Sequence, residues 1–136
     1  MEMMLKVCAI FVTIMLVSCA TIPSALPEKY NLDDDLEAVD QISTFKVSSW
    51  KRVGNQSVIL RVNWNDYYLI VLRRPIDIMI SNHSIGIDST LSTIKSGYDR
   101  IVVKDHTGTQ YYVIDKIYKL KGKKQAEEIR ERLRRK

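Results

Sequence analysis

The residue with the clearest chemical potential is Cys19, whose thiol directly follows the small residue Ser18. Leu16 lies three positions before this cysteine and ends, with Val17, the apolar run Val7–Val17. A run of this length suits the hydrophobic region of a secretory signal and is too short to span a bilayer. Small side chains let a peptidase reach the bond between Ser18 and Cys19, and the thiol can carry a lipid. We therefore expect cleavage at this bond and lipidation of Cys19.

This arrangement is similar to a bacterial lipobox, which would place the protein in the cell envelope. It predicts a signal peptide over residues 1–18 and a tether over residues 19–30, anchored to the membrane by acyl chains (palmitate) on Cys19. Two or three acyl chains anchor a protein stably, whereas one does not. Ala20 follows Cys19 where an Asp would favour retention in the inner membrane, so we expect the outer membrane, with the domain in the periplasm. The alternative is an ordinary secretory signal in which the cysteine occurs by chance.

The remaining chemical groups form no catalytic pattern. Cys8 would leave with the signal, so the mature domain would have no thiol, and no nucleotide-binding, zinc-protease or hydrolase motif occurs. His83 and His106 could act as bases or metal ligands, but both lie in predicted polar loops, where a solvated His is the simpler interpretation. The acidic run 33–35 could hold a cation or favour the positive end of a helix dipole. We expect no catalytic residue, no metal and no cofactor.

Hydrophobic periodicity predicts the elements of a single domain over residues 31–120. Asn31 can cap a short helix in which Leu32, Leu36 and Val39 share one face. From Ile42 onward the period changes to two, and turn signals separate short apolar segments near residues 45–49, 58–64, 67–72, 76–80, 85–87, 100–104 and 111–114. Segment 67–72 is apolar on both faces and reads as a central strand. The sequence predicts a mainly β (α+β) fold, a small antiparallel sheet curled or closed into a barrel, with a short N-terminal helix and a basic C-terminal helix.

Several short patterns together carry a resemblance to a known group. They are Ser49-Trp50-Lys51, Tyr68-Leu69-Ile70 with Leu72 and Pro75, Ile85-Gly86-Ile87, Gly97-Tyr98-Asp99, Ile101-Val102-Val103 and Ile114-x-x-Ile117. With the lipobox, they resemble an uncharacterised family of small proteobacterial lipoprotein-like proteins of unknown function. The resemblance implies a disulfide in many members, at the positions of Ile76 and Tyr112 here, so apolar packing would replace it. The family brings no activity, and the resemblance supports fold and location only.

Four aromatic residues lie close together along the chain and could form a binding surface. Clustered aromatic side chains on a small barrel can stack on sugars, and the candidates here are Trp50, Trp64, Tyr67 and Tyr68. In the alternative interpretation, Trp64 and Tyr68 fill the core while Tyr67 lies at an edge. The sequence leaves both interpretations open.

The C-terminal segment 121–136 is strongly basic and predicted to be helical. Lys116–Lys136 has ten basic and three acidic residues, a net charge of +7, whereas Cys19–Asp115 has a net charge of −2. The helix could be a solvated charged element, or an arm that binds anionic lipid or cell-wall polymer through Lys121, Lys123, Lys124, Arg130, Arg132, Arg134, Arg135 and Lys136. Its last two residues are also similar to the end of the major murein lipoprotein of enterobacteria, whose final Lys is joined to peptidoglycan.

These observations favour a lipid-anchored, non-enzymatic envelope protein that acts as a binding or scaffolding module. Three observations support this interpretation: the predicted anchor, the cationic C-terminal segment and the lack of a recognisable set of catalytic residues. The alternative is an enzyme or accessory factor that acts on the cell wall through an aromatic cleft. Nucleic acid is not an expected partner because the domain would lie in the periplasm. The sequence points to no protein partner.

Overall fold

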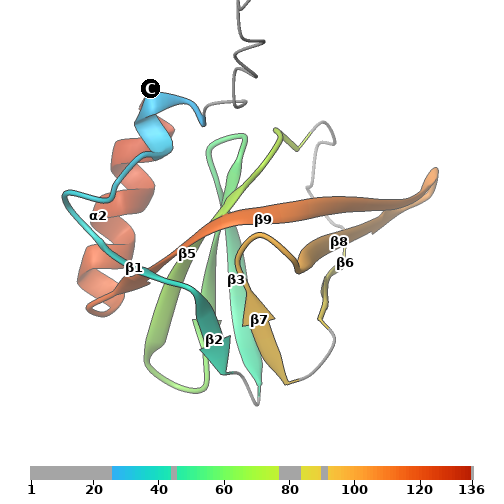
Figure 1. Ribbon diagram of the computed structural model, residues 1–136, viewed down its shortest axis with the longest axis horizontal. Coiled ribbons are helices and arrows are strands. Elements are labelled where there is room, and N and C mark those ends of the chain that lie inside the picture. Colours follow the sequence, from blue (N-terminus) through green and yellow to red (C-terminus); the bar gives the residue numbers. More distant parts are fainter. Residues whose placement is uncertain (1–25, 44–45, 77–83, 90–91, 136) are drawn as a thin grey trace, which may run out of the picture.

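Three consecutive strands form the first half of the sheet. The computed structural model describes residues 26–43, 46–76, 84–89 and 92–135. In it, β3 (Val47–Val53), β4 (Ser57–Val62) and β5 (Asp66–Leu72) are antiparallel neighbours (Figure 1). The turn between β3 and β4 contains Gly54 at φ 63°, a left-handed conformation that glycine adopts without steric cost. This turn and the central position of β5 confirm the sequence-based prediction.

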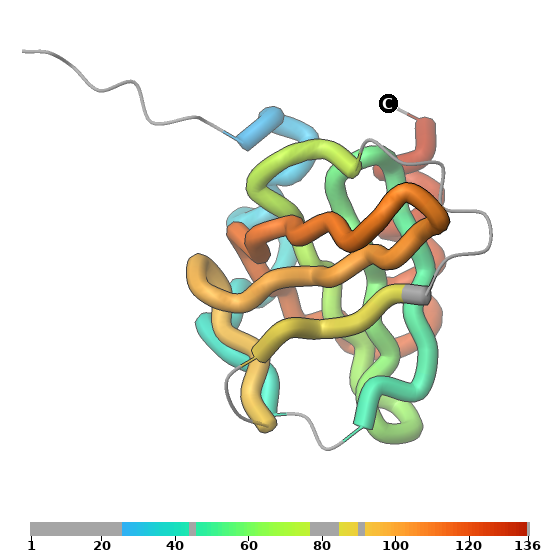
Figure 2. Tube along the Cα trace, turned by 90° about the vertical axis from the view of Figure 1, so that its right-hand side faces the viewer, coloured from blue at the N-terminus to red at the C-terminus, as the bar shows by residue number. Residues whose placement is uncertain are grey.

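The long strand β9 (Gly108–Leu120) connects this half of the sheet to the other half. Its C-terminal part pairs with β5, and its N-terminal part pairs with β8 (Arg100–Asp105), which pairs with β6 (Ser84–Asp88). The register between β5 and β9 shifts near Val71 and Leu72, where a bulge increases the local twist. The sheet therefore curls into a half-barrel (Figure 2), and the predicted mainly β fold is confirmed.

Three very short strands complete the architecture. β1 (Glu37–Val39) pairs with β9 beside Ile117–Lys119, and β2 (Gln41–Ser43) pairs with β7 (Thr93–Lys95) in a separate two-stranded sheet. The sequence analysis predicted none of the three. A strand of three residues contains too few positions to establish a period of two.

The curled sheet buries apolar side chains on both faces. One core cluster lies inside the curl and includes Leu60, Ile70 and Tyr112. The other lies outside it and includes Leu69 and Val71 of β5, packed under the helix α2 (Lys123–Arg134). Alternating residues of β5 therefore enter different cores, which explains why this segment is apolar on both faces. None of the helices in the described ranges is long and apolar enough to span a membrane.

The predicted helix starting at Asn31 is replaced by a different local structure. A 3-10 helix, Glu28–Tyr30, ends at Asn31, and the chain then makes one turn in which Leu36 N donates to Leu32 O at 2.8 Å. The hydroxyl of Tyr118 accepts the Leu32 N–H at 3.1 Å. The sequence suggested that Asp33 would lie at the positive end of a helix dipole, but its carboxylate instead contacts Lys116 and Tyr118 of β9. Leu32 and Leu36 are buried against the sheet, as their spacing predicts.

Two of the patterns shared with the family have structural roles. The Asp99 carboxylate accepts the Lys95 N–H at 2.6 Å, and Gly97, at φ 79°, donates its N–H to Ile114 O at 2.7 Å, so this motif fastens the turn after β7 to β9. Ile76 and Tyr112 are both buried in the inner core cluster. Apolar packing therefore occupies the two positions at which the resemblance implied a disulfide.

Candidate functional site: a cationic groove between helix and sheet

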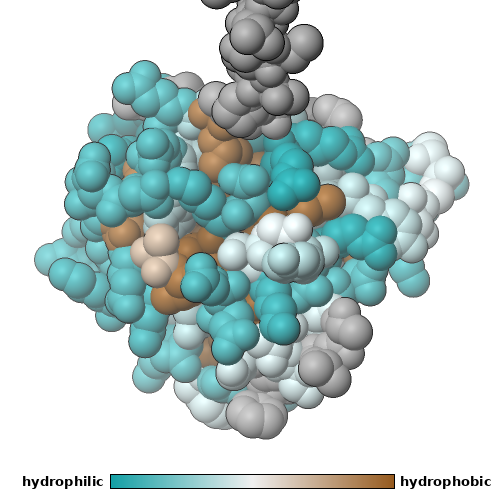
Figure 3. Space-filling model, viewed as in Figure 1, coloured by the Kyte–Doolittle hydropathy of each residue, from teal (hydrophilic) through white to brown (hydrophobic). Residues whose placement is uncertain are grey.

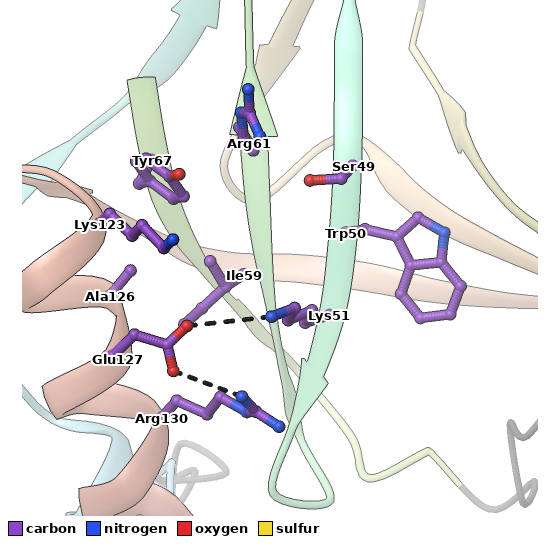
Figure 4. A pocket seen from close by; sticks show the side chains of 10 residues that line it. All are labelled: Ser49, Trp50, Lys51, Ile59, Arg61, Tyr67, Lys123, Ala126, Glu127 and Arg130. Atoms are coloured by element: carbon purple, nitrogen blue, oxygen red, sulfur yellow. Dashed lines mark hydrogen bonds and ion pairs between the residues drawn. The ribbon is translucent and has the colours of Figure 1, made fainter. Parts of the chain in front are cut away.

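A groove of about 210 Å³ lies between α2 and the outer face of β3, β4 and β5 (Figure 4). We call it the helix–sheet groove. Strand register positions one of its sides, since Ser49 of β3 lies opposite Arg61 of β4, and Arg61 lies opposite Tyr67 of β5. On the other side, four residues of α2 at positions i, i+3, i+4 and i+7 share one helix face. The described residues that line it are Ser49, Trp50, Lys51, Ile59, Arg61, Tyr67, Lys123, Ala126, Glu127 and Arg130.

Cations outnumber carboxylates in this groove by four to one. The basic side chains are Lys51, Arg61, Lys123 and Arg130, and the carboxylate is Glu127. Glu127 is shared, because its Oε1 lies 3.9 Å from Lys51 Nζ and its Oε2 lies 3.3 Å from an Arg130 terminal nitrogen. Among the described residues, no carboxylate lies within ion-pair distance of Arg61 or Lys123. The groove therefore has a net formal charge of +3.

Apolar floor and cationic rim make the groove suited to an anion. Ile59 and Ala126 are buried beneath it, whereas Lys51 and Lys123 are exposed at its mouth. Figure 4 shows Arg130 and Arg61 at opposite ends of the groove, with Lys51 between them. Arg61 Nε donates to Trp64 O at 2.8 Å, which orients the guanidinium. Planar guanidinium groups bind phosphate and carboxylate oxygens in pairs, and ammonium groups add point charges.

The lining offers little for acid–base or nucleophilic chemistry. No histidine is among the described residues that line the groove, and Glu127 is engaged by two cations. His106 is exposed in the turn between β8 and β9, while His83 lies outside the described residues. Within the described part of the chain, no three His, Cys, Asp or Glu side chains are grouped to hold a metal ion. Of the predicted acidic run, Asp33 binds Lys116 at 2.6 Å and Asp35 binds Arg132 at 2.8 Å.

Comparison with known proteins gives a family for this chain. Residues 1–136 match a family described as a family of unknown function (DUF6491). The chain belongs to this family. No curated protein and no solved structure matches it. Membership agrees with the uncharacterised family expected from the sequence, while the lipoprotein character and proteobacterial source stay predictions.

The basic C-terminal segment forms the predicted helix, but it is not a detached arm. Ala126, Ile129 and Leu133 are buried against the sheet, and hydrophilic side chains cover the outer side of α2 (Figure 3). Of the seven described cations among the eight proposed for anion binding, two, Lys123 and Arg130, line the helix–sheet groove. The helix spacing would allow i,i+4 pairs of Glu128 with Arg132 and of Glu131 with Arg135. Among the described residues neither pair forms, since Arg132 binds Asp35 and Glu131 lies 3.9 Å from Arg134.

The other predicted anion-binding residues are distributed over the surface. Lys121 and Lys124 line a separate shallow hollow at the start of α2, and Arg134 and Arg135 are exposed at its end. Lys136 lies outside the described residues, as do Ser18 and Cys19. The structure therefore brings together part of the predicted set and adds Lys51 and Arg61 from the sheet.

The four aromatic residues do not form one platform. Trp50 and Tyr68 pack against the inner core, Tyr67 packs against the outer core and lines the groove, and Trp64 is 80 % exposed. Trp50 borders the groove, yet Figure 4 shows its ring pointing away from the other lining residues. The alternative that placed Trp64 in the core is wrong as well. β4 ends at Val62, and Asn63 at φ 53° turns the chain before Trp64 is reached.

Sequence reasoning missed Ser49, Lys51, Arg61 and Glu127. A signal was present, since Arg61 interrupts the apolar strand β4 on the face that it shares with Ile59. A charge at such a position indicates a partner or a ligand near that face. The approach of α2 to the same face could not be read from the pattern.

Proposed function

We propose that this protein is a lipid-anchored envelope module that binds an anionic ligand in the helix–sheet groove. The observation that carries the proposal is the convergence of Lys51, Arg61, Lys123 and Arg130 above an apolar floor, with one carboxylate among them. The residues come from two strands and one helix, so the fold itself brings the charges together. Cations that line one groove repel each other, and a bound anion would relieve that repulsion.

The sequence supports attachment to a membrane. The lipobox-like segment Leu16–Cys19 would supply a lipidated N-terminus after cleavage. Leu26, where the described chain begins, follows Cys19 by seven residues, and a fully extended chain of that length spans at most about 25 Å. The start of the domain would therefore lie close to the membrane surface, on the periplasmic side.

Metabolic labelling tests the anchor directly. Cells that express the full chain are grown with an alkyne analogue of palmitate, and the purified protein is examined for label. We expect the wild-type chain to carry the label and the Cys19→Ala variant to lack it, with the variant released from the membrane fraction. An unlabelled wild-type chain would remove the anchor from the proposal.

Calorimetric titration with inorganic polyphosphate tests the groove. The Arg61→Gln and Lys123→Gln variants should each bind several-fold more weakly than wild type, and added salt should weaken the wild-type complex because it screens the charges. Lys104→Gln is the matched control, since Lys104 is an exposed cation on β8 outside the groove. Equal losses in all three variants would indicate a response to net charge and would contradict a defined site.

A further inference from the structure

A second hollow adjoins the helix–sheet groove. Its volume is about 320 Å³, and it lies beside the turn between β4 and β5. We call it the Trp64 hollow, and its lining is Lys46, Ser48, Arg61, Asn63 and Trp64. Arg61 lines both the groove and this hollow, so the two adjoin at its side chain.

Backbone contacts build the Trp64 hollow. Asn63 N donates to Lys46 O at 2.9 Å, and the Ser48 hydroxyl donates to Asn63 O, so the start of β3 is fastened to the turn. Arg61 Nε donates to Trp64 O and holds the other side of the turn. Trp64 therefore projects from a hairpin whose backbone is fixed on both sides.

The exposure of Trp64 distinguishes this hollow. An indole that is 80 % exposed leaves a large apolar surface in water, and such surfaces mark binding sites when polar groups surround them. Lys46 and Arg61 supply the charge of the hollow, and no carboxylate is among the described residues that line it. Ser48 and Asn63 add groups that can form hydrogen bonds with hydroxyls.

We infer that the ligand of this surface is an acidic oligosaccharide, with one sugar ring stacked on Trp64 and its acidic groups extending past Arg61 into the helix–sheet groove. This inference rests on the proposed function and names its ligand class. Sugar rings present apolar C–H faces that pack on aromatic rings, while their hydroxyls need polar partners. Both requirements are met at the Trp64 hollow. A bilayer surface would fit less well, since the other described residues that line the hollow are polar or charged.

The test compares two probes on the full chain, an oligogalacturonate and inorganic polyphosphate, by calorimetric titration. Trp64→Ala should weaken oligogalacturonate binding about fivefold and leave polyphosphate binding unchanged, because only the sugar uses the ring. Tyr98→Ala, which removes another exposed aromatic side chain, is the matched control and should change neither affinity.

The outcomes separate this inference from the function on which it rests. Unchanged oligogalacturonate affinity in Trp64→Ala would overturn it, and so would an equal loss for both probes. Binding of polyphosphate without any binding of oligogalacturonate would overturn the sugar specificity and leave the anion site in place. If neither probe binds the wild-type chain, the proposed function itself fails.

Discussion

At the scale of single residues, two fully buried tyrosines of β9 have opposite hydrogen-bonding environments. Tyr118 accepts the Leu32 N–H and donates to the Asp33 carboxylate at 3.0 Å, so its hydroxyl is satisfied within the outer core. The Tyr112 hydroxyl is buried in the inner core without a hydrogen-bond partner among the described residues. We therefore expect the Tyr118 hydroxyl to stabilise the fold and the Tyr112 hydroxyl to destabilise it.

Removing the two hydroxyls tests this contrast. Tyr118→Phe should lower the free energy of unfolding by about 1–3 kcal/mol, because the Leu32 N–H loses its acceptor in a buried position. Tyr112→Phe should leave the free energy unchanged or raise it, because it deletes an unsatisfied polar atom. Urea denaturation of both variants measures the difference, and equal destabilisation would contradict the assignment.

The ion pair between Asp33 and Lys116 predicts how stability depends on pH. The hydrogen bond from Lys116 holds the pKa of Asp33 below its ordinary value of 3.8. The unfolded chain therefore binds this proton at a higher pH than the folded chain, and the contribution of Asp33 is present above 3.8 and lost as pH falls through its folded pKa. Between about pH 5 and pH 2, Asp33→Asn should lose less stability than wild type. An identical acid dependence would show that the pair contributes nothing.

At the scale of elements, the turn between β3 and β4 holds the N-terminal segment in place. The Tyr30 hydroxyl accepts the Gln56 N–H at 3.2 Å and donates to the Asn55 side chain at 2.9 Å. A Cβ atom added at Gly54 would lie 2.8 Å from this hydroxyl. The tight turn and the buried tyrosine therefore depend on each other.

Two glycine substitutions separate backbone strain from this contact. Gly54 and Gly97 both have positive φ, so alanine at either position should cost about 1–2 kcal/mol. A Cβ atom at Gly97 meets no heavy atom within 4 Å, whereas at Gly54 it displaces Tyr30. Thermal unfolding should therefore show a larger loss for Gly54→Ala than for Gly97→Ala. The reverse order would indicate that Tyr30 does not hold the turn.

Local sequence patterns predicted which strands and helices form better than they predicted how these elements pack against one another. The hairpin turns, the central strand β5 and the helix α2 follow from periodicity and turn residues. Strand β9 continues past Ile114 to Leu120, although Lys116 and Lys119 suggested the start of a basic tail. The site could be predicted only in part, because Lys123 belongs to a basic segment while Arg61 acquires its role when α2 packs on β4.

At the scale of the whole molecule, α2 is both a wall of the groove and the cover of the outer core. Ile129 and Leu133 pack in the same cluster as Leu69 of β5. Removing the helix would expose this cluster, so a truncation cannot report on charge alone.

Substitutions at a buried and at an exposed position of α2 separate its packing role from its contribution of charge. Leu133→Ala should lower the free energy of unfolding by about 2–5 kcal/mol, because it leaves a cavity in the outer core. Lys124→Ala, at an exposed position of the same helix, should change it by less than about 0.5 kcal/mol. Similar values for the two variants in urea denaturation would mean that α2 does not pack on the sheet in solution.

The central claim is that one groove, formed where α2 meets the sheet, binds anions. The most direct measurement follows the backbone amide resonances of the isotope-labelled full chain while inorganic polyphosphate is added. We predict saturable shifts concentrated at Lys51, Arg61, Lys123 and Arg130. Shifts centred instead on Lys121 and Lys124, or spread evenly over the exposed cations, would contradict the account.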